Sequence, residues 1–436
     1  RERCPASTRD GRISVLLACG SFQLGGSERN VFNIATGLPV EEFSVSVLGF
    51  VGDGPLRQEL VNRGVRVQVA DWSFDPRRLS TDLTRLRGEM VRAAPDVLHL
   101  FNYPTIYFGV AAGVATGVPV RIVAIQAYDT WKGWTETIVD RILRPAVTLY
   151  LTDGDGTRSY TMRQQRLRPG HIQSLYDGPD LNGLRPTASA AAVRARLGLS
   201  PSRFVVGVIG RLNDVHKGQS VFLECIAKIP ADSPAQFVLV GGGRDEAALR
   251  QQAERLALKD RVVFAGPQTE LGNVLHSLDL LVIPSLRYES VPKILLEGMA
   301  AARPIIASRV GDIPEFLAGN DTGVLVEPGD PAALAEAIRH LLAHPAEARA
   351  MGARARASLV SRRITLQDSL AALADIYRRQ LAISRPVNSL LRSRVRLAMA
   401  VYRNCRLAEE RARWLLGRRS RRSLPFPPGS CAAPPD

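Results

Sequence analysis

Short runs of β-branched and aliphatic residues alternate with stretches of helical periodicity through most of the chain, as in parallel α/β sheets. The first series of predicted strands covers residues 13–18, 44–48, 65–69, 96–100, 120–125, 149–152 and 172–175. The second series covers residues 205–209, 237–240, 262–265, 280–283, 305–307 and 323–326. Helical segments separate the strands in both series. The pattern therefore predicts an α/β protein with two doubly wound, Rossmann-like domains.

The predicted domains are divided by a segment rich in Gly, Pro, Asn and Asp, DGPDLNGLRPTAS. A chain of 436 residues also exceeds what one hydrophobic core usually organises. The first domain is predicted to cover residues 1–178, followed by a linker at 179–201 and the second domain at 202–364. A terminal helix at 365–384 is expected to return to the first domain, and residues 385–436 form a tail. Ligands are expected beyond the carboxyl ends of the strands, in the cleft between two facing domains.

Composition narrows the class of protein. Apolar residues make up 45% of the chain and charged residues 23%, which is typical of a folded soluble protein. The five cysteines form no CxxC motif and no Cys/His cluster, so neither a disulfide framework nor a zinc site is indicated and a reducing cytosol fits best. No apolar stretch is long enough to span a bilayer, and no signal peptide opens the chain. A cytoplasmic protein is expected.

Two glutamates in RYESVPKILLEGMA, residues 287–300, are candidate functional groups. Pro292 suits the first turn of a helix, which places Glu289 in the preceding loop and Glu297 inside the helix. A wholly helical segment would separate the two by about 12 Å, too far for a paired acid and base. Two contacts with one elongated ligand are the better interpretation, although a surface glutamate is as good an account of Glu297 taken alone.

Basic and glycine-rich loops are candidates for phosphate binding. In VVGVIGRLNDVHKG a strand leads to Gly210 and Arg211, and Lys217 follows at an expected helix start. A guanidinium fork and an ammonium together suit a diphosphate, whereas the alternative is a solvated basic loop. In ACGSFQLGGSERN, backbone N–H groups at Gly25 and Gly26 can hold a phosphate, and a plain tight turn is the alternative.

Together these segments resemble the retaining GT-B glycosyltransferases of family 4. The matching elements follow in order: LGGSERNVFNIATGL, PDVLHL, GRLNDVHKG, LVGGGRDEAALR, RVVFAG, LDLLVIPSLRYESVPKILLEGMAAARPIIAS, VGDIPEF and GVLVEPGD. Each motif is weak alone, but their order and spacing across residues 12–380 are specific. The resemblance implies a GT-B fold in which the second domain binds a nucleotide sugar and the first domain binds the acceptor.

The resemblance also implies roles for single residues. Arg211 and Lys217 would hold the diphosphate and stabilise the leaving group, and Glu289 would contact the donor sugar, so these three are the predicted catalytic residues. Glu297 would bind the ribose hydroxyls. Further donor contacts are expected at Gly25, Gly26, Gly210, Ser290 and Val291. No essential metal ion and no cofactor are expected, because this fold needs no DxD motif.

On the acceptor side the sequence departs from many relatives, which carry a histidine after the fifth strand. Here VRIVAIQAYD offers Gln126, and Asp129 is a second candidate. The expected function is retaining transfer of a hexose or N-acetylhexosamine from a UDP- or GDP-linked donor to a glycan or lipid-linked acceptor, in polysaccharide or glycolipid biosynthesis. The alternatives are a catalytically silent sugar-nucleotide-binding protein or another GT-B enzyme, such as an epimerase or a phosphorylase.

The end of the chain carries most of its excess positive charge. The net charge is +15, and residues 385–436 contribute +9 of it, from 12 arginines and 3 acidic residues. Residues 388–418 have helical periodicity with one apolar face, which favours attachment of residues 385–422 to an anionic membrane surface, at the inner face of the plasma membrane. A helix that packs on the domains with a solvated basic face is the alternative. Nucleic acid is not expected, since aromatic residues do not alternate with the arginines.

Overall fold

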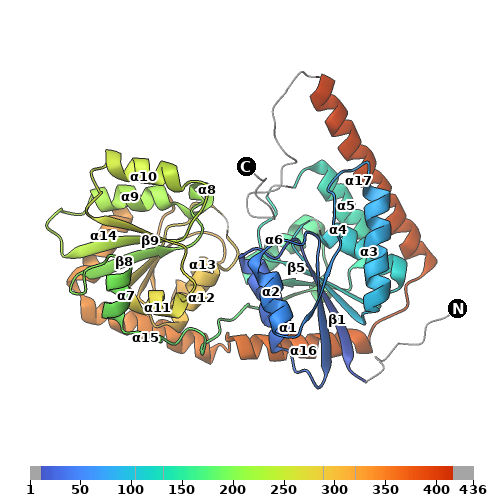
Figure 1. Ribbon diagram of the computed structural model, residues 1–436, viewed down its shortest axis with the longest axis horizontal. Coiled ribbons are helices and arrows are strands. Elements are labelled where there is room, and N and C mark those ends of the chain that lie inside the picture. Colours follow the sequence, from blue (N-terminus) through green and yellow to red (C-terminus); the bar gives the residue numbers. More distant parts are fainter. Residues whose placement is uncertain (1–10, 104, 131, 288, 320, 416–436) are drawn as a thin grey trace. The chain divides into compact units, whose positions relative to one another are not determined.

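The computed structural model describes residues 11–103, 105–130, 132–287, 289–319 and 321–415, which form two compact units (Figure 1). The first unit contains the chain up to Asp153, Arg158–Leu175 and the residues from Leu370 on. The second contains Gly154–Thr157 and Tyr176–Ser369. The predicted membrane segment and the Pro-rich end extend into residues 416–436, which lie outside the described residues.

The first unit is built on a parallel sheet of seven strands within the described residues, in the order β3-β2-β1-β4-β5-β6-β7. The strands are β1 (Ile13–Cys19), β2 (Phe43–Gly49), β3 (Arg66–Val69), β4 (Val97–Phe101), β5 (Val120–Ile125), β6 (Leu149–Thr152) and β7 (Ile172–Ser174). The helices are α1 (Gly26–Gly37), α2 (Pro55–Asn62), α3 (Leu79–Ala93), α4 (Thr105–Thr116), α5 (Trp134–Leu143), α6 (Asp155–Gln165), α16 (Leu366–Ala382) and α17 (Ser389–Leu415), of which α6 and α16 begin in the second unit. Short 3-10 turns occupy Arg144–Ala146 and Pro169–His171.

The second unit is built on a parallel sheet of six strands within the described residues, in the order β10-β9-β8-β11-β12-β13. The strands are β8 (Phe204–Ile209), β9 (Ala235–Val240), β10 (Val262–Gly266), β11 (Leu280–Ile283), β12 (Ile305–Ser308) and β13 (Val324–Val326). The helices are α7 (Ala190–Arg196), α8 (Asp214–Lys217), α9 (Gln219–Ala227), α10 (Glu246–Arg255), α11 (Leu271–Ser277), α12 (Lys293–Ala300), α13 (Ile313–Leu317), α14 (Pro331–Ala343) and α15 (Pro345–Ser361). The predicted pair of Rossmann-like parallel sheets is confirmed.

Helices cover both faces of each sheet, which explains why the central strands are apolar at successive positions. In the first unit, α3, α4, α5 and α17 cover one face and α1, α2 and α16 cover the other (Figure 1). In the second unit, α9, α10 and α14 pack on one face, and α7, α11, α12 and α13 on the other. β5 and β11, for example, contain only residues that are buried.

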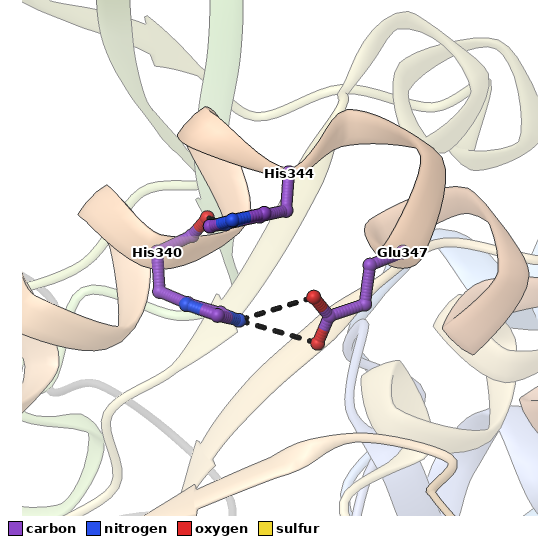
Figure 2. Close-up of side chains that lie close together, drawn as sticks. All are labelled: His340, His344 and Glu347. Atoms are coloured by element: carbon purple, nitrogen blue, oxygen red, sulfur yellow. Dashed lines mark hydrogen bonds and ion pairs between the residues drawn. The ribbon is translucent and has the colours of Figure 1, made fainter.

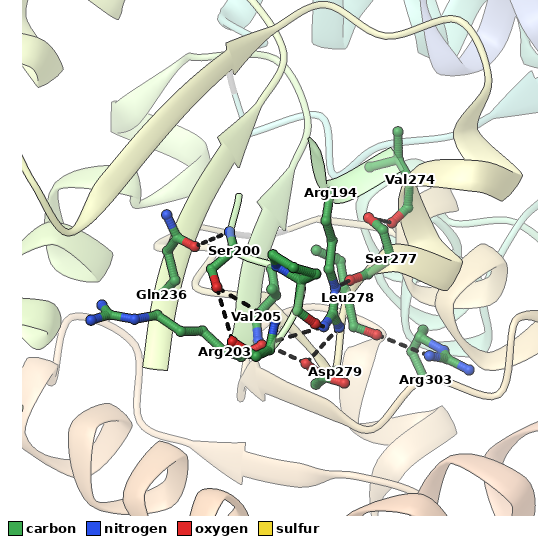
Figure 3. A network of polar contacts seen from close by, with 12 residues as sticks. Arg194, Ser200, Arg203, Val205, Gln236, Val274, Ser277, Leu278, Asp279 and Arg303 are labelled. Atoms are coloured by element: carbon green, nitrogen blue, oxygen red, sulfur yellow. Dashed lines mark hydrogen bonds and ion pairs between the residues drawn. The ribbon is translucent and has the colours of Figure 1, made fainter. Parts of the chain in front are cut away.

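A polar network fixes the amino ends of the two central strands of the second sheet, β8 and β11 (Figure 3). Arg194 of α7 forms an ion pair of 2.7 Å with Asp279, the residue before β11, and donates to the carbonyl oxygen of Ser277 at 2.8 Å. The carboxylate of Asp279 also accepts from the backbone N–H of Val205 in β8 at 2.8 Å. Because both strands are held at this end, the loops that follow them begin from fixed positions.

Helix α17 packs its apolar face on the first unit. Val395, Ala398 and Met399 are buried in the core of this unit, and Tyr402 lies against Phe108 of α4 with ring centroids 5.2 Å apart. An ion pair joins Arg406 to Glu136 of α5. The periodicity predicted for this segment is thus present, but its apolar face contacts protein. Among the described helices, none is both long enough and apolar enough to cross a bilayer.

A buried histidine at the centre of the first sheet should make this unit sensitive to acid. His99 of β4 lies 2.8 Å from the hydroxyl of Tyr377 through Nδ1, and its Nε2 has no hydrogen-bond partner among the described residues. Burial lowers the pKa of His99 from 6.5 to about 3. The neutral ring is therefore favoured in the folded state, so its contribution to stability is complete above pH 6.5 and is lost as the pH falls below that value.

The free energy of unfolding of the first unit should fall by about 2 kcal/mol between pH 6.5 and pH 5 because of His99 alone. The variant His99→Leu should lack this part of the slope, although its absolute stability also falls because the hydroxyl of Tyr377 loses its partner. Urea unfolding followed by tryptophan fluorescence measures this, since all four tryptophans fall in segments of the first unit. Equal pH slopes in the two proteins would contradict the prediction.

Candidate functional site

The predicted donor-binding loops follow the two strands at which the order of the second sheet reverses. β8 and β11 are neighbours, β9 and β10 extend the sheet on one side, and β12 and β13 extend it on the other. Helices that follow β8 and β11 therefore leave toward opposite faces, which opens a crevice at the carboxyl ends of these strands. Ligands of open α/β sheets bind at such a point. The sequence patterns predicted the strands but not the order of the strands in the sheet.

The loop after β8 presents the two predicted cations. Gly210 has φ 154°, and a Cβ on Gly241 would lie 2.0 Å from the carbonyl oxygen of Gly210, so the loops after β8 and β9 touch through their backbones. The side chain of Arg211 is exposed. Lys217 was predicted at a helix start, but it ends the short helix α8 and Gly218, at φ 64°, turns the chain into α9.

An ion pair joins this loop to the loop after β11. Lys217 Nζ lies 2.7 Å from Glu289 Oε1, and the same carboxylate oxygen accepts a hydrogen bond of 3.1 Å from Ser285 Oγ. The side chain of Glu289 is 12% exposed and that of Lys217 is 33% exposed, so the carboxylate is largely covered while the ammonium is partly open to solvent. The structure thus brings two of the three predicted catalytic residues into direct contact.

The remaining donor-side candidates lie at the start of α12. Ser290 and Val291 are buried. Pro292 was predicted in the first turn of the helix, but its backbone is extended and it is the N-cap, so that the helix begins at Lys293. Glu297 is half-buried within α12. Lys293, on the first turn, pairs with Asp177 at 3.3 Å. Glu289 therefore belongs to the loop and Glu297 to the helix, in agreement with the interpretation of two separate carboxylates.

A second buried group holds the Glu289–Ser290 segment and was not identified from the sequence. Asp312, which is 2% exposed, donates its backbone N–H to the carbonyl oxygen of Glu289 at 3.2 Å. Its carboxylate accepts from Ser290 Oγ at 3.4 Å and from Thr157 Oγ1 at 2.6 Å. Gly311, at φ 54°, lets the two backbones approach. The only signal in the sequence was a Gly-Asp pair between a strand and a helix, in VGDIPEF.

His216 also lies in this region. Burial, followed by the positive charge of Arg287, lowers the pKa of His216 below its usual value. The imidazole is therefore neutral at pH 7 and adds no charge to the cations of the loop. Its backbone carbonyl accepts from Leu286 N–H at 2.9 Å, a further link between the loops that follow β8 and β11.

The glycine loop of the first unit occupies the equivalent point of its own sheet. The strand order reverses between β1 and β4, and the loop follows β1. Gly25 caps α1 and Gly26 is the first helical residue. Glu28, buried in the first turn, accepts a hydrogen bond of 2.9 Å from Asn102 Nδ2, in the loop after β4. This hydrogen bond joins the start of α1 to the loop after β4, the strand beside β1 at which the order reverses.

The two acceptor-side candidates follow β5. Gln126 is half-buried at the end of the strand. Asp129 forms an ion pair of 2.5 Å with Lys132, which also pairs with Asp140 at 3.0 Å. Burial by itself would lower the pKa of Lys132, but the two carboxylates outweigh it and raise that pKa. Lys132 thus stays charged between the carboxylates of Asp129 and Asp140.

Comparisons with known proteins assign both halves of the chain to one kind of protein. Residues 203–344 match the family model described as "Glycosyl transferases group 1". Residues 25–176 match the model described as "Glycosyl transferase 4-like domain". The matched segments contain the loops after β8 and β11 and the glycine loop that leads into α1. Together they cover more than half of the chain.

Two curated relatives share the same name. A D-inositol 3-phosphate glycosyltransferase of Segniliparus rotundus is 36% identical over 191 residues, which is 42% of this chain and 42% of the relative. One of Saccharomonospora viridis is 30% identical over 315 residues, which is 66% of this chain and 71% of the relative. The match to the first relative thus spans about two fifths of its length. Among solved structures, HepE of Anabaena in complex with UDP-glucose has a TM-score of 0.74 at 20% identity, covering 84% of this chain and 99% of that one, which shows the fold.

Proposed function

The chain belongs to the glycosyl transferases group 1 family, and we propose that it moves a hexose or N-acetylhexosamine from a UDP- or GDP-linked donor to an acceptor with retention of configuration. The acceptor would be a glycan or a lipid-linked molecule, in polysaccharide or glycolipid biosynthesis. Because both relatives are named for D-inositol 3-phosphate, a phosphorylated polyol should also be tested as an acceptor. A UDP sugar is the first donor to test, because the solved structure of HepE, which has the same fold, contains UDP-glucose.

The observation that carries the proposal is the contact between Lys217 and Glu289 across the reversal point of the second sheet. Arg211 and Lys217 would bind the diphosphate and stabilise the charge that builds on it as the glycosidic bond breaks. Glu289, held against Lys217, would contact the donor sugar. The amides of Ser290 and Val291 would face the phosphates, and Glu297 would bind the ribose.

The same residues account for a reaction without an essential metal ion. Two cationic side chains at the leaving diphosphate supply the positive charge that a divalent ion supplies in other phosphate chemistry. Retention would follow from attack by the acceptor on the face from which the diphosphate leaves, through an oxocarbenium-like state. Gly25 and Gly26 would contact the diphosphate, and Gln126 and Asp129 would contact the acceptor.

A screen of nucleotide sugars tests the proposal. The chain should bind one donor and hydrolyse it slowly, and Glu297→Ala should weaken donor binding by about tenfold because a ribose contact is lost. Glu254→Ala, an exposed glutamate of α10, is the matched control and should leave the affinity unchanged. Binding without transfer to any acceptor in cell extract would favour the catalytically silent protein, and interconversion of free sugar nucleotides would favour an epimerase. No binding to any donor would contradict all three.

We also propose that the outward face of α17 attaches the protein to an anionic membrane surface, at the cytoplasmic side. Because the apolar face packs on the first unit, the attraction would be electrostatic. Exposed arginines gather on the outward face, while the acidic residues described on this helix, Glu409 and Glu410, pair with Arg406 and Arg77. These exposed arginines are Arg394, Arg396, Arg403 and Arg411, whereas Arg392, also exposed, donates to the carbonyl oxygen of Ala115 in α4 at 2.9 Å.

Flotation with vesicles containing phosphatidylserine tests this attachment. Each arginine near the surface contributes about 1 kcal/mol, so the triple variant Arg394→Gln, Arg396→Gln, Arg403→Gln should bind about 100-fold more weakly. A control with the same loss of charge on the second unit, Arg255→Gln, Arg349→Gln, Arg356→Gln, should bind as the parent does. Equal binding by both triple variants would show that the arginines of α17 do not attach the protein to the membrane.

A further inference from the structure

Three potential metal ligands meet where helices α14 and α15 join. α14 ends at Ala343 and α15 begins at Pro345, so His344 is the single residue between them. His340 lies in the last turn of α14 and Glu347 in the first turn of α15 (Figure 2). All three side chains are exposed, and Figure 2 shows the rings of His340 and His344 side by side with the carboxylate of Glu347 facing His340.

The distances among these side chains suit one small cation. His340 Nε2 lies 3.2 Å from each carboxylate oxygen of Glu347. Ligands at about 2.0 Å from a tetrahedral zinc ion are about 3.3 Å apart, which is nearly the same separation. One ligand atom from each of the three residues lies within 4.8 Å of the other two. Small side-chain rotations would therefore bring His344 to the same ion.

A hydrogen bond prepares His344 for this role. Its Nδ1 lies 2.8 Å from the backbone carbonyl oxygen of His340, which can only accept, so Nδ1 carries the proton. The lone pair of the neutral ring is then on Nε2. Histidines that bind metal ions commonly donate their other ring N–H to a carbonyl or a carboxylate, because this fixes the ring and its tautomer.

We propose that His340, His344 and Glu347 bind a divalent first-row transition metal ion, with Zn²⁺ as the ion that fits best. Zinc binds both imidazole nitrogens and carboxylate oxygens, and the spacing H-x3-H places both rings on one side of the helix end. Three protein ligands leave a fourth position for water. Within the described residues, no other three histidine, cysteine or acidic side chains are clustered in this way.

The site would act on the helix joint and not on sugar transfer. α14 follows β13 and runs back along the sheet, so its last turn lies at the amino edge, opposite the carboxyl edge that carries Lys217 and Glu289. Metal bound there would fix α14 to α15. α15 in turn packs closely on the end of α12, since a Cβ on Gly352 would lie 2.2 Å from the carbonyl oxygen of Ala302.

Calorimetric titration of the metal-free full-length chain with Zn²⁺ tests the site. The parent should bind one ion that the double variant His340→Ala, His344→Ala does not bind, and each single variant, including Glu347→Gln, should weaken the affinity by about tenfold or more. His171→Ala, which removes an exposed histidine of the first unit, is the control and should bind as the parent does. Cobalt in place of zinc should give the visible absorption of a four-coordinate ion in the parent and in His171→Ala but not in the double variant.

Thermal unfolding gives a second measurement. Zn²⁺ should raise the unfolding temperature of the second unit in the parent and in His171→Ala but not in the double variant, because an ion that binds only the folded state stabilises it. These exposed substitutions leave the core intact, so the variants remain folded. Equal zinc affinity in the parent and the double variant, or no zinc binding by the parent, would overturn the proposal.

Discussion

Replacing Lys217 with alanine should lower the rate of sugar transfer by about 100- to 1000-fold, because a preorganised cation facing a developing negative charge contributes most in the transition state. The substitution also removes the partner of Glu289, whose Oε1 keeps only the hydrogen bond from Ser285 among those described above. The donor sugar would then be held less firmly as well. Initial rates at saturating donor and acceptor separate this loss in kcat from a change in KM.

Two further variants show whether the charge or the geometry of Lys217 matters. Lys217→Arg keeps the positive charge but not the compact ammonium, and it should recover only part of the rate. Lys228→Ala removes an exposed lysine at the end of α9, outside the crevice, and should have the parent's rate. A Lys217→Ala enzyme with the parent's kcat would exclude this lysine from stabilisation of the leaving group.

The second large effect should come from Gly311→Ala, a change of one methyl group. Gly311 has φ 54°, and a Cβ there would lie 1.6 Å from the carbonyl oxygen of Glu289, so the Glu289 loop must move. The positive φ alone costs about 1 kcal/mol for alanine, and the clash should raise the total to about 3 kcal/mol. The moved loop should also bind UDP about tenfold more weakly, since Glu289 would leave Lys217.

The variant Gly198→Ala separates the cost of a positive φ from the cost of the clash with Glu289. Gly198 has a similar φ, 73°, but its Cβ would meet nothing within 4 Å, so only the backbone cost applies. Differential scanning calorimetry of the second unit, with UDP titration of both variants, compares them directly. Gly311→Ala and Gly198→Ala proteins with equal stability and equal UDP affinity would show that Gly311 does not position the loop.

Most strands could be predicted from the sequence because they are short runs rich in buried aliphatic residues. Val120–Ile125, Leu149–Thr152 and Leu280–Ile283 agree with the predicted bounds residue for residue, and the other strands differ by one or two residues at their ends. The order of the strands could not be predicted in this way, since a buried strand looks the same at any position in a sheet. The reversal points therefore came only from the structure.

The candidate site was predicted in part. Arg211, Lys217, Glu289 and Glu297 were identified from motifs, but the ion pair between Lys217 and Glu289 joins residues 72 positions apart and leaves no local pattern. Asp312 was missed because its role depends on contacts with Thr157, 155 residues away in the chain. His340 and Glu347, by contrast, are close in sequence, and the spacing H-x3-H-x2-E is a local pattern from which this cluster could have been predicted.

The apolar face of α17 shows a different limit of sequence patterns. Its helical periodicity was predicted, and Val395 and Ala398 do lie on one face. Periodicity indicates that a face is covered, not whether lipid or protein covers it. For the side chains that the structure describes on α17, up to Arg411, the covering is protein, because the apolar face lies on α4 and α5 of the first unit.

The position of α16 and α17 has a consequence for synthesis on the ribosome. Arg378 pairs with Glu42 across 336 residues of chain, and Tyr377 and Val395 complete the core around strands made at the start of translation. Apart from Gly154–Thr157, the second unit consists of the continuous segment Tyr176–Ser369. The whole of this segment leaves the ribosome before the residues from Leu370 on, which complete the first unit. The usual order, in which the amino-terminal domain matures first, would be reversed. A nascent chain stopped before α17 would expose an uncovered apolar surface and should depend on chaperones.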